Sequence, residues 1–255
     1  MRAVSIAAVA TGAPAYSNAA DEVAVTPYRP TVSTPAALSA TDWIEVELGL
    51  LSSSGGAPPS RDSAPYTIKL AFSDNWGVRI GGELWVRDIG AKGRNIDGIG
   101  DTAFVLKRRF AVDDKSAFGL ELGVMSPTAP AGLHGGSGGT DYGMNAIYST
   151  DFGSAFHTDL NYSVTRVGLA TAGQGRDLAL WAAALSYAVD PQWGLTGELS
   201  GTQQSGADPT RQLLLAATYS PYKRITWDLG FARGMTTATA SWSVFAGCTF
   251  LVSQL

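Results

Sequence analysis

The sequence is short of charge, cysteine and histidine. Charged residues make up 16% of its 255 residues, against a usual share of about 25%. Hydrophobic residues still reach 45%, so the chain is not a disordered polyanion. The formal net charge of -4 provides no basic surface, and we expect no nucleic-acid partner. One cysteine, Cys248, and two histidines, His134 and His157, exclude a disulfide framework and a zinc site of cysteine and histidine ligands.

A long hydrophobic run is also missing. No stretch of the sequence reaches the ~18 consecutive apolar residues of a membrane-spanning helix. A β-barrel crosses a membrane with strands of alternating polarity, which give a much weaker signal. The missing run therefore excludes a helical span and leaves a membrane barrel open.

The first residues, 1–20, predict a signal peptide. Arg2 gives a positive start, residues 3–10 are apolar and alanine-rich, and Ser17-Asn18-Ala19 is a small-x-small end. These are the parts of a secretory signal. We expect cleavage after Ala19 or Ala20. An exported chain with almost no disulfide potential is typical of a bacterial envelope protein.

Residues 21–41 form a proline-containing segment ahead of the main body of the chain. Pro27, Pro30 and Pro35 exclude a regular helix and disfavour a central strand. The segment is therefore predicted to be extended. The sequence leaves open whether it is a loose linker or lies inside the domain.

From residue 42 onward, polarity alternates with a period of two. Ile44, Val46 and Leu48 alternate with Glu45 and Glu47, as in a strand with one apolar and one polar face. The pattern recurs in about twelve runs. Most runs are longer than the ~5–6 residues of soluble strands and match the ~9–11 residues of a tilted strand across a bilayer. The runs are centred on residues 44–50, 66–73, 78–86, 101–110, 118–124, 141–149, 156–165, 179–189, 193–200, 212–219, 225–231 and 241–250.

Short and long connections alternate along the chain. Asp113-Asp114-Lys115 and Asp190-Pro191-Gln192 are short, whereas residues 88–99 and 127–140 are long. Outer-membrane barrels have short periplasmic turns and longer external loops. Residues 42–255 are thus predicted to form an all-β, closed, antiparallel transmembrane barrel of about twelve strands in the outer membrane of a Gram-negative bacterium. Membrane lipid and the barrel-assembly machinery are its expected partners.

Aromatic residues lie near the ends of the predicted strands. Membrane barrels carry such rings as girdles at the headgroup level, so their placement favours a membrane barrel over a soluble sheet. The aromatic residues are Tyr66, Trp76, Phe110, Phe118, Tyr142, Tyr148, Phe156, Tyr187, Trp193, Tyr219 and Trp242.

The polar face of the predicted strands carries charges of both signs. Buried unpaired charges are costly, so these side chains need partners or water. About 8 strands give a filled barrel and 16–18 an aqueous channel. The charges therefore either pair across a plugged lumen or line a narrow wet channel, and small inward residues such as Gly119 and Gly247 favour a passage. The candidate lumen-lining residues are Glu45, Glu47, Lys69, Arg79, Glu83, Asp101, Lys107, Arg109, Glu121, Asp159, Glu198 and Asp228.

No pattern in the sequence indicates catalysis. Gly136-Ser137-Gly138 precedes a predicted strand rather than a helix, so neither a phosphate cradle nor a nucleophile elbow is expected. His157 falls on the inward polar face and His134 in a glycine-rich loop. A membrane enzyme would instead need a serine–histidine pair on its lipid-facing rim. We predict that the protein is not an enzyme and uses no cofactor and no metal.

Several motifs resemble one outer-membrane family, labelled "meta-pathway of phenol degradation", whose members are named as transporters. The resemblance implies a closed outer-membrane barrel that passes small molecules, among them aromatic or apolar ones. The motifs are Gly98-Ile99-Gly100-Asp101, Lys107-Arg108-Arg109-Phe110, Gly123-Val124-Met125-Ser126-Pro127-Thr128, Gly138-Gly139-Thr140-Asp141-Tyr142 and Asn161-Tyr162.

The function that the sequence favours is passive passage of a small-molecule permeant through a narrow lumen, with charged side chains setting selectivity. The alternative is a plugged barrel without an open pore, used for envelope structure or surface interaction. Dense pairing across the lumen, or residues 21–41 threading it, would favour this alternative. A soluble β domain and a membrane enzyme are weaker alternatives.

Overall fold

The computed structural model describes residues 23–56, 58–90, 95–130, 133 and 136–255. The predicted signal peptide (residues 1–20) and His134 lie outside this part of the chain. The described residues contain no helix long and apolar enough to cross a membrane. Thirteen strands account for most of them.

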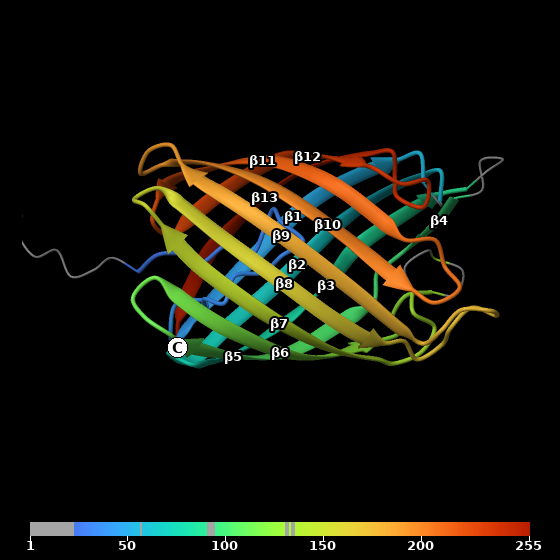
Figure 1. The fold of residues 1–255 in the computed structure, drawn as a ribbon, viewed down its shortest axis with the longest axis horizontal. Coiled ribbons are helices and arrows are strands. Elements are labelled where there is room, and N and C mark those ends of the chain that lie inside the picture. Colours follow the sequence, from blue (N-terminus) through green and yellow to red (C-terminus); the bar gives the residue numbers. More distant parts are fainter. Residues whose placement is uncertain (1–22, 57, 91–94, 131–132, 134–135) are drawn as a thin grey trace, which may run out of the picture.

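The strands close into a single antiparallel barrel (Figure 1). Apart from β4 and β5, which both pair with β3, each strand pairs with its neighbours in sequence, and β1 closes the ring by pairing with both β13 and β2. The predicted all-β closed barrel is confirmed. The strands are β1 (Trp43–Ser54), β2 (Ser60–Ser73), β3 (Trp76–Ile89), β4 (Asn95–Gly98), β5 (Thr102–Ala111), β6 (Ser116–Ser126), β7 (Asp141–Phe152), β8 (Phe156–Arg166), β9 (Asp177–Ala188), β10 (Trp193–Gln204), β11 (Thr210–Tyr222), β12 (Ile225–Gly234) and β13 (Trp242–Gln254).

The thirteenth strand is β4, which lies in a connection predicted to be a loop, residues 88–99. It pairs with the last residues of β3, from Val86 to Ile89, whereas β5 pairs with the first part of β3. Together β4 and β5 occupy the position of one strand. The barrel wall is therefore twelve strands wide, and the hairpin of β3 and β4 extends it at one point.

A bulge between β2 and β3 breaks the alternation that the sequence predicts. Pro65 has no N–H group for the strand ladder, and the register shifts there: Ala64 lies opposite Trp85, but Pro65 lies opposite Glu83. An extra residue in one strand moves the following side chains to the other face. Plain alternation over residues 78–86 would put Val86 on the outer face, which is wrong, because Val86 is 0% exposed.

Short turns and long connections lie at opposite ends of the barrel, hereafter the short-turn end and the long-loop end. The C-terminus lies at the short-turn end, where the N–H of Leu255 bonds to the carbonyl of Asp42. Rings from neighbouring strands contact each other in tilted pairs at the same end, for example Phe118 with Tyr148 and Trp193 with Tyr219, with centroids 5.0 and 4.6 Å apart. Such pairs stabilise adjacent strands.

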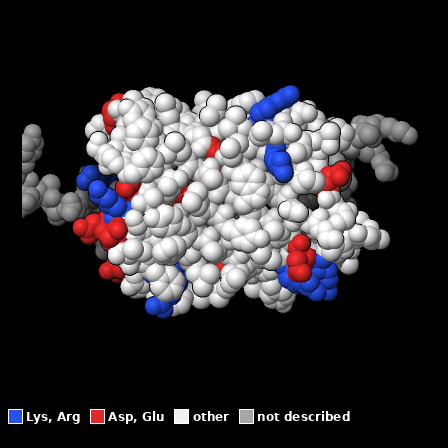
Figure 2. All heavy atoms as spheres, in the orientation of Figure 1, with Lys and Arg blue, Asp and Glu red and all other residues white. Residues whose placement is uncertain are grey.

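The outer surface is apolar over its middle. Leucines such as Leu50, Leu215 and Leu229 are more than half exposed (65%, 56% and 65%). On the face drawn in Figure 2, charged atoms gather mostly toward the two ends, and a broad uncharged band lies between them. A large exposed apolar surface of this kind is expected where a protein meets hydrocarbon rather than water.

Candidate functional site

The N-terminal segment, residues 23–41, lies inside the barrel (Figure 1). Ser33 and Ala36 are 0% exposed and Tyr28 is 7% exposed. The segment has almost no strand partner of its own; a single parallel bridge joins Thr41 to Ala71 just before β1 begins. Of the two arrangements that the sequence left open, the loose linker is therefore wrong.

Wall carboxylates bind the backbone of the N-terminal segment. An extended segment that does not pair with a neighbouring strand leaves its backbone N–H groups without partners. Buried N–H groups need acceptors. Glu45 accepts from the N–H of Thr26 (2.9 Å) and Glu47 from that of Tyr28 (2.6 Å). Glu198 accepts from two backbone N–H groups and from the hydroxyl of Ser33, at 2.7 to 3.0 Å.

Tyr28 lies between two buried lysines. The Nζ atoms of Lys69 and Lys107 lie 3.9 and 4.2 Å from its ring centroid, close enough for cation–π attraction. The Tyr28 hydroxyl donates to the carbonyl of Ala37 (2.9 Å) and accepts from Lys107 Nζ (3.0 Å). Burial, together with the nearby Glu121 carboxylate, raises the pKa of Tyr28 well above its usual value, so the phenol remains a neutral donor.

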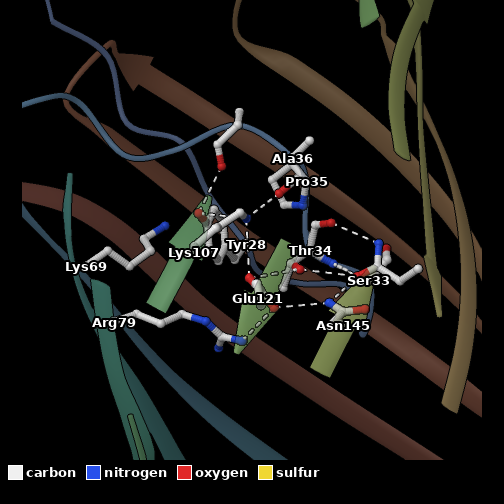
Figure 3. A network of polar contacts seen from close by, with 12 residues as sticks. Tyr28, Ser33, Thr34, Pro35, Ala36, Lys69, Arg79, Lys107, Glu121 and Asn145 are labelled. Atoms are coloured by element: carbon white, nitrogen blue, oxygen red, sulfur yellow. Dashed lines mark hydrogen bonds and ion pairs between the residues drawn. The ribbon is translucent and has the colours of Figure 1, made fainter. Parts of the chain in front are cut away.

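Glu121 is the centre of a second polar group (Figure 3). Its carboxylate oxygens lie 3.2 Å from Arg79 Nη2, 3.4 Å from Lys107 Nζ and 3.0 Å from Asn145 Nδ2. The hydroxyl of Thr34 lies 3.5 Å away. Cations and donors from three strands and from the N-terminal segment therefore converge on one buried carboxylate, as a buried charge requires.

Arg29 attaches the N-terminal segment to the opposite wall. Its Nε and Nη2 atoms each lie 3.1 Å from an oxygen of Asp228, a two-point contact. The guanidinium passes over Gly49 and Gly247. A Cβ atom at either glycine would lie 2.4 to 2.5 Å from the nearest Arg29 atom, so the guanidinium in its present position requires glycine at both.

Two further wall residues bind the backbone of the segment. Asn161 accepts from the N–H of Thr34 (3.0 Å) and donates to its carbonyl (2.9 Å). The Ser149 hydroxyl accepts from the N–H of Ala36 (2.7 Å) and donates to Asp159. The segment is therefore bound along most of its length by side chains from strands far apart in the sequence.

Most of the twelve sequence-predicted residues are buried. Arg79 and Glu83 are only half-buried, and Glu83 pairs with Arg61 at 2.7 Å. Arg109 is half-buried as well. Asp101 accepts from the backbone of Ala129 (2.9 Å) in the connection after β6. The other buried members are Glu45, Glu47, Lys69, Lys107, Glu121, Asp159, Glu198 and Asp228.

Sequence analysis missed the residues through which the segment is bound. Tyr28 and Arg29 lie in a stretch without periodicity. The run at residues 27–33 that contains them fits the family resemblance, but nothing in it assigned these two residues a role. Asn145, Ser149 and Asn161 sit on inward positions of predicted strands. Because they carry no charge, they were not predicted to line the lumen, although their inward phase was readable; Asn161 was named only as part of the family motif Asn161-Tyr162.

Free space remains on the long-loop side of the N-terminal segment. One cavity of about 260 Å³ is bounded by Arg79, Glu121 and Asn145 and by small residues such as Gly123 and Gly143. Around Tyr28, Lys69 and Lys107, in contrast, the free volume is only about 10 Å³. The lumen is thus filled at the level of Tyr28 and hollow beyond it.

A second cavity, of about 210 Å³, lies against the other wall. The N-terminal segment contributes Arg29, Pro30 and Val32 to it. The wall contributes the apolar Leu51, Leu214 and Phe245, beside the polar Gln212 and Ser243. Leu214 and Phe245 also belong to a buried apolar cluster with Ala216 and Ala232. The interior of a membrane barrel is usually polar, so this apolar wall is an unusual feature of the lumen.

Comparison with solved structures identifies the fold. The chain is similar to NanC porin (TM-score 0.57, 11% identity, covering 82% of this chain and 100% of that one) and to KdgM porin (0.56, 12%, 82% and 99%). It is also similar to the CymD monoaromatic hydrocarbon channel (0.51, 10%, 84% and 89%). At these identities the likeness is one of fold. No protein-family model and no curated protein matches the chain, so membership of the phenol-degradation family stays a prediction.

Proposed function

We propose that this protein is an outer-membrane channel for small molecules, and that its N-terminal segment is the gate. The support for a channel is the closed barrel with an uncharged outer band, and a fold similar to that of structures described as porins and as a hydrocarbon channel. The support for a gate is the contrast in free volume. The lumen is filled around Tyr28 and hollow on the long-loop side, so a solute crosses only when the segment shifts.

The proposed permeant is a small apolar molecule. The observation that carries this assignment is the apolar cavity beside Val32, with inward-facing Leu51, Leu214 and Phe245. Burying apolar surface contributes roughly 25 cal/mol per Å², so this wall favours an apolar solute over a sugar or an ion. The side chains around Glu121 then act as structural partners of the gate. The predicted absence of catalysis, cofactor and metal stays a prediction.

Uptake into liposomes tests the permeant class. Vesicles with the refolded chain and with lipopolysaccharide in the outer leaflet, which slows direct partitioning of apolar solutes, should take up a small aromatic such as toluene at least several-fold faster than matched vesicles with a Leu214→Gln, Phe245→Gln variant, while arabinose uptake stays low in both. The contradicting result is rapid arabinose uptake with no dependence on Leu214 and Phe245, which would indicate a polar pore.

A plugged barrel remains the second candidate, and the bonding of the N-terminal segment favours it. Glu198, Asp228 and Asn161 each hold the segment with two or more hydrogen bonds. If the segment never shifts, function would lie in the loops at the long-loop end. The two candidates differ in one measurable property, conductance.

A further inference from the structure

Outward-facing arginines differ between the two ends of the barrel. At the long-loop end, Arg87 pairs with Asp97 and Arg166 with Asp177, each with atoms 2.8 Å apart. In both cases the carboxylate belongs to the neighbouring strand. These arginines therefore have protein partners of opposite charge.

At the short-turn end, aromatic rings take the place of carboxylates. The guanidinium of Arg108 in β5 lies 4.7 Å from the ring centroid of Trp76 and 4.8 Å from that of Phe110. Arg224, between β11 and β12, lies 4.8 Å from the ring of Trp43. Within the described part of the chain, neither arginine side chain has a hydrogen-bond acceptor, and Nε of Arg108 is fully buried without one.

Arg108 lies on the lipid-facing side of β5. It shares this face with Phe104, Leu106 and Phe110, which are 50%, 39% and 43% exposed, while its neighbour Lys107 is buried on the lumen side. Rings that face a guanidinium leave its edge free. Because Nε of Arg108 is buried, the donors left for a ligand are those of Nη1 and Nη2, whose spacing matches two oxygens of one phosphate. The site therefore offers a held cation with unused donors at a surface that otherwise faces hydrocarbon.

We propose that Arg108, held between Trp76 and Phe110, binds the phosphate of a phospholipid headgroup in the membrane leaflet at the short-turn end. Phosphate is favoured over water as the partner because the ring pair lies in the aromatic zone, at the level where headgroups begin. Arg224 on Trp43 provides a more exposed contact of the same kind on another part of the rim. The inference uses the membrane placement of the proposed function but not the pore, so the two can fail separately.

Native mass spectrometry of the refolded chain in detergent, titrated with dioleoyl phosphatidylglycerol, tests the proposal. Arg108→Gln should weaken the tightest lipid-binding step by roughly tenfold, the effect of losing one charge-assisted hydrogen bond. Arg108→Lys keeps the charge but not the paired donors, and should lie between wild type and Arg108→Gln. Heat-dependent gel mobility confirms that each variant is folded.

Two controls fix the interpretation. Arg87 also lies over a ring, that of Trp85 at 5.2 Å, but its guanidinium has a carboxylate partner. Arg87→Gln should therefore leave lipid binding unchanged. Dioleoylglycerol, which lacks phosphate, should bind all variants alike. The proposal is overturned if Arg108→Gln binds the phospholipid as wild type does. It is also overturned if inorganic phosphate at millimolar concentration displaces the lipid, since the site would then take free anions.

Discussion

At the scale of single residues, the lumen is organised by carboxylates that accept from backbone N–H groups. Lysines and arginines neutralise only some of the inward acids. Glu198, for example, is 1% exposed, and its hydrogen bonds within the described part of the chain all come from Val32 and Ser33. The acids on the wall of this barrel therefore provide hydrogen-bond acceptors for a segment whose backbone N–H groups are not paired with a strand.

Glu198→Ala should loosen the N-terminal segment. The change leaves the N–H groups of Val32 and Ser33 without acceptors, at about 1–3 kcal/mol for each buried group left unpaired. We expect the free energy of unfolding, measured by denaturant titration in lipid vesicles, to fall by about 2–6 kcal/mol if the segment stays in place. Glu198→Gln keeps one carbonyl oxygen and should cost less; an equal cost for both variants would contradict this account.

Gly49→Val should expel Arg29 from its site. The new Cβ would lie 2.4 Å from Nη1 of Arg29, and the displaced guanidinium would leave Asp228 buried and alone. Breaking a buried ion pair costs about 3–5 kcal/mol. Gly123→Val is the matched control, because its added Cβ meets no atom closer than 3.5 Å.

A double-mutant cycle separates this effect from simple crowding. In an Arg29→Ala background the guanidinium is already gone, so Gly49→Val should cost little beyond it. If the losses of unfolding free energy in the two single variants add up fully in the double variant, Gly49 and Arg29 act independently. That result would contradict the close approach of Arg29 to Gly49.

At the scale of elements, strands were predictable and the position of the N-terminal segment was not. Alternation is a local property, so the runs from residues 44–50 to 241–250 correspond to strands in the structure. The exception, the inward Val86, follows from a bulge opposite Pro65, which no periodicity marks. Residues 23–41 are held by side chains from β1, β7, β8, β10 and β12, and such distant pairings leave no pattern in a single sequence.

Small inward residues show the same limit. The sequence suggested that they leave a passage. Gly123 and Gly143 do border a cavity, but the space over Gly247 is taken by Arg29, and a Cβ at Gly119 would lie 3.3 Å from Ala36. A glycine shows where room exists, and only the fold shows what fills it.

Tethering the segment to the wall should abolish passage. Ala36→Cys and Gly119→Cys, in a chain with Cys248→Ser, place two thiols within reach of a disulfide. Toluene uptake by vesicles with lipopolysaccharide in the outer leaflet, which slows direct partitioning of apolar solutes, should fall several-fold on oxidation and recover on reduction. The single-cysteine variants should not respond to either reagent. Unchanged uptake in the oxidised form would mean that the segment does not gate.

At the scale of the whole molecule, the account requires the outer band to face hydrocarbon. Leu215→Arg, in the middle of β11, should reduce the free energy of unfolding in lipid vesicles by about 2–4 kcal/mol, whereas Tyr222→Arg at the end of the same strand should cost about 0–1 kcal/mol. Both side chains are exposed, 56% and 74%, so a difference between them reports depth in the bilayer. Equal costs would contradict the membrane placement.

The central claim is that the barrel is a channel gated by residues 23–41. Single-channel recording in a planar bilayer tests it most directly, with the mature chain compared to a chain that begins at residue 42. The account predicts rare, small current steps for the mature chain and steady, several-fold larger steps after the segment is removed. Two folded and silent chains, or two chains with the same conductance, would contradict it.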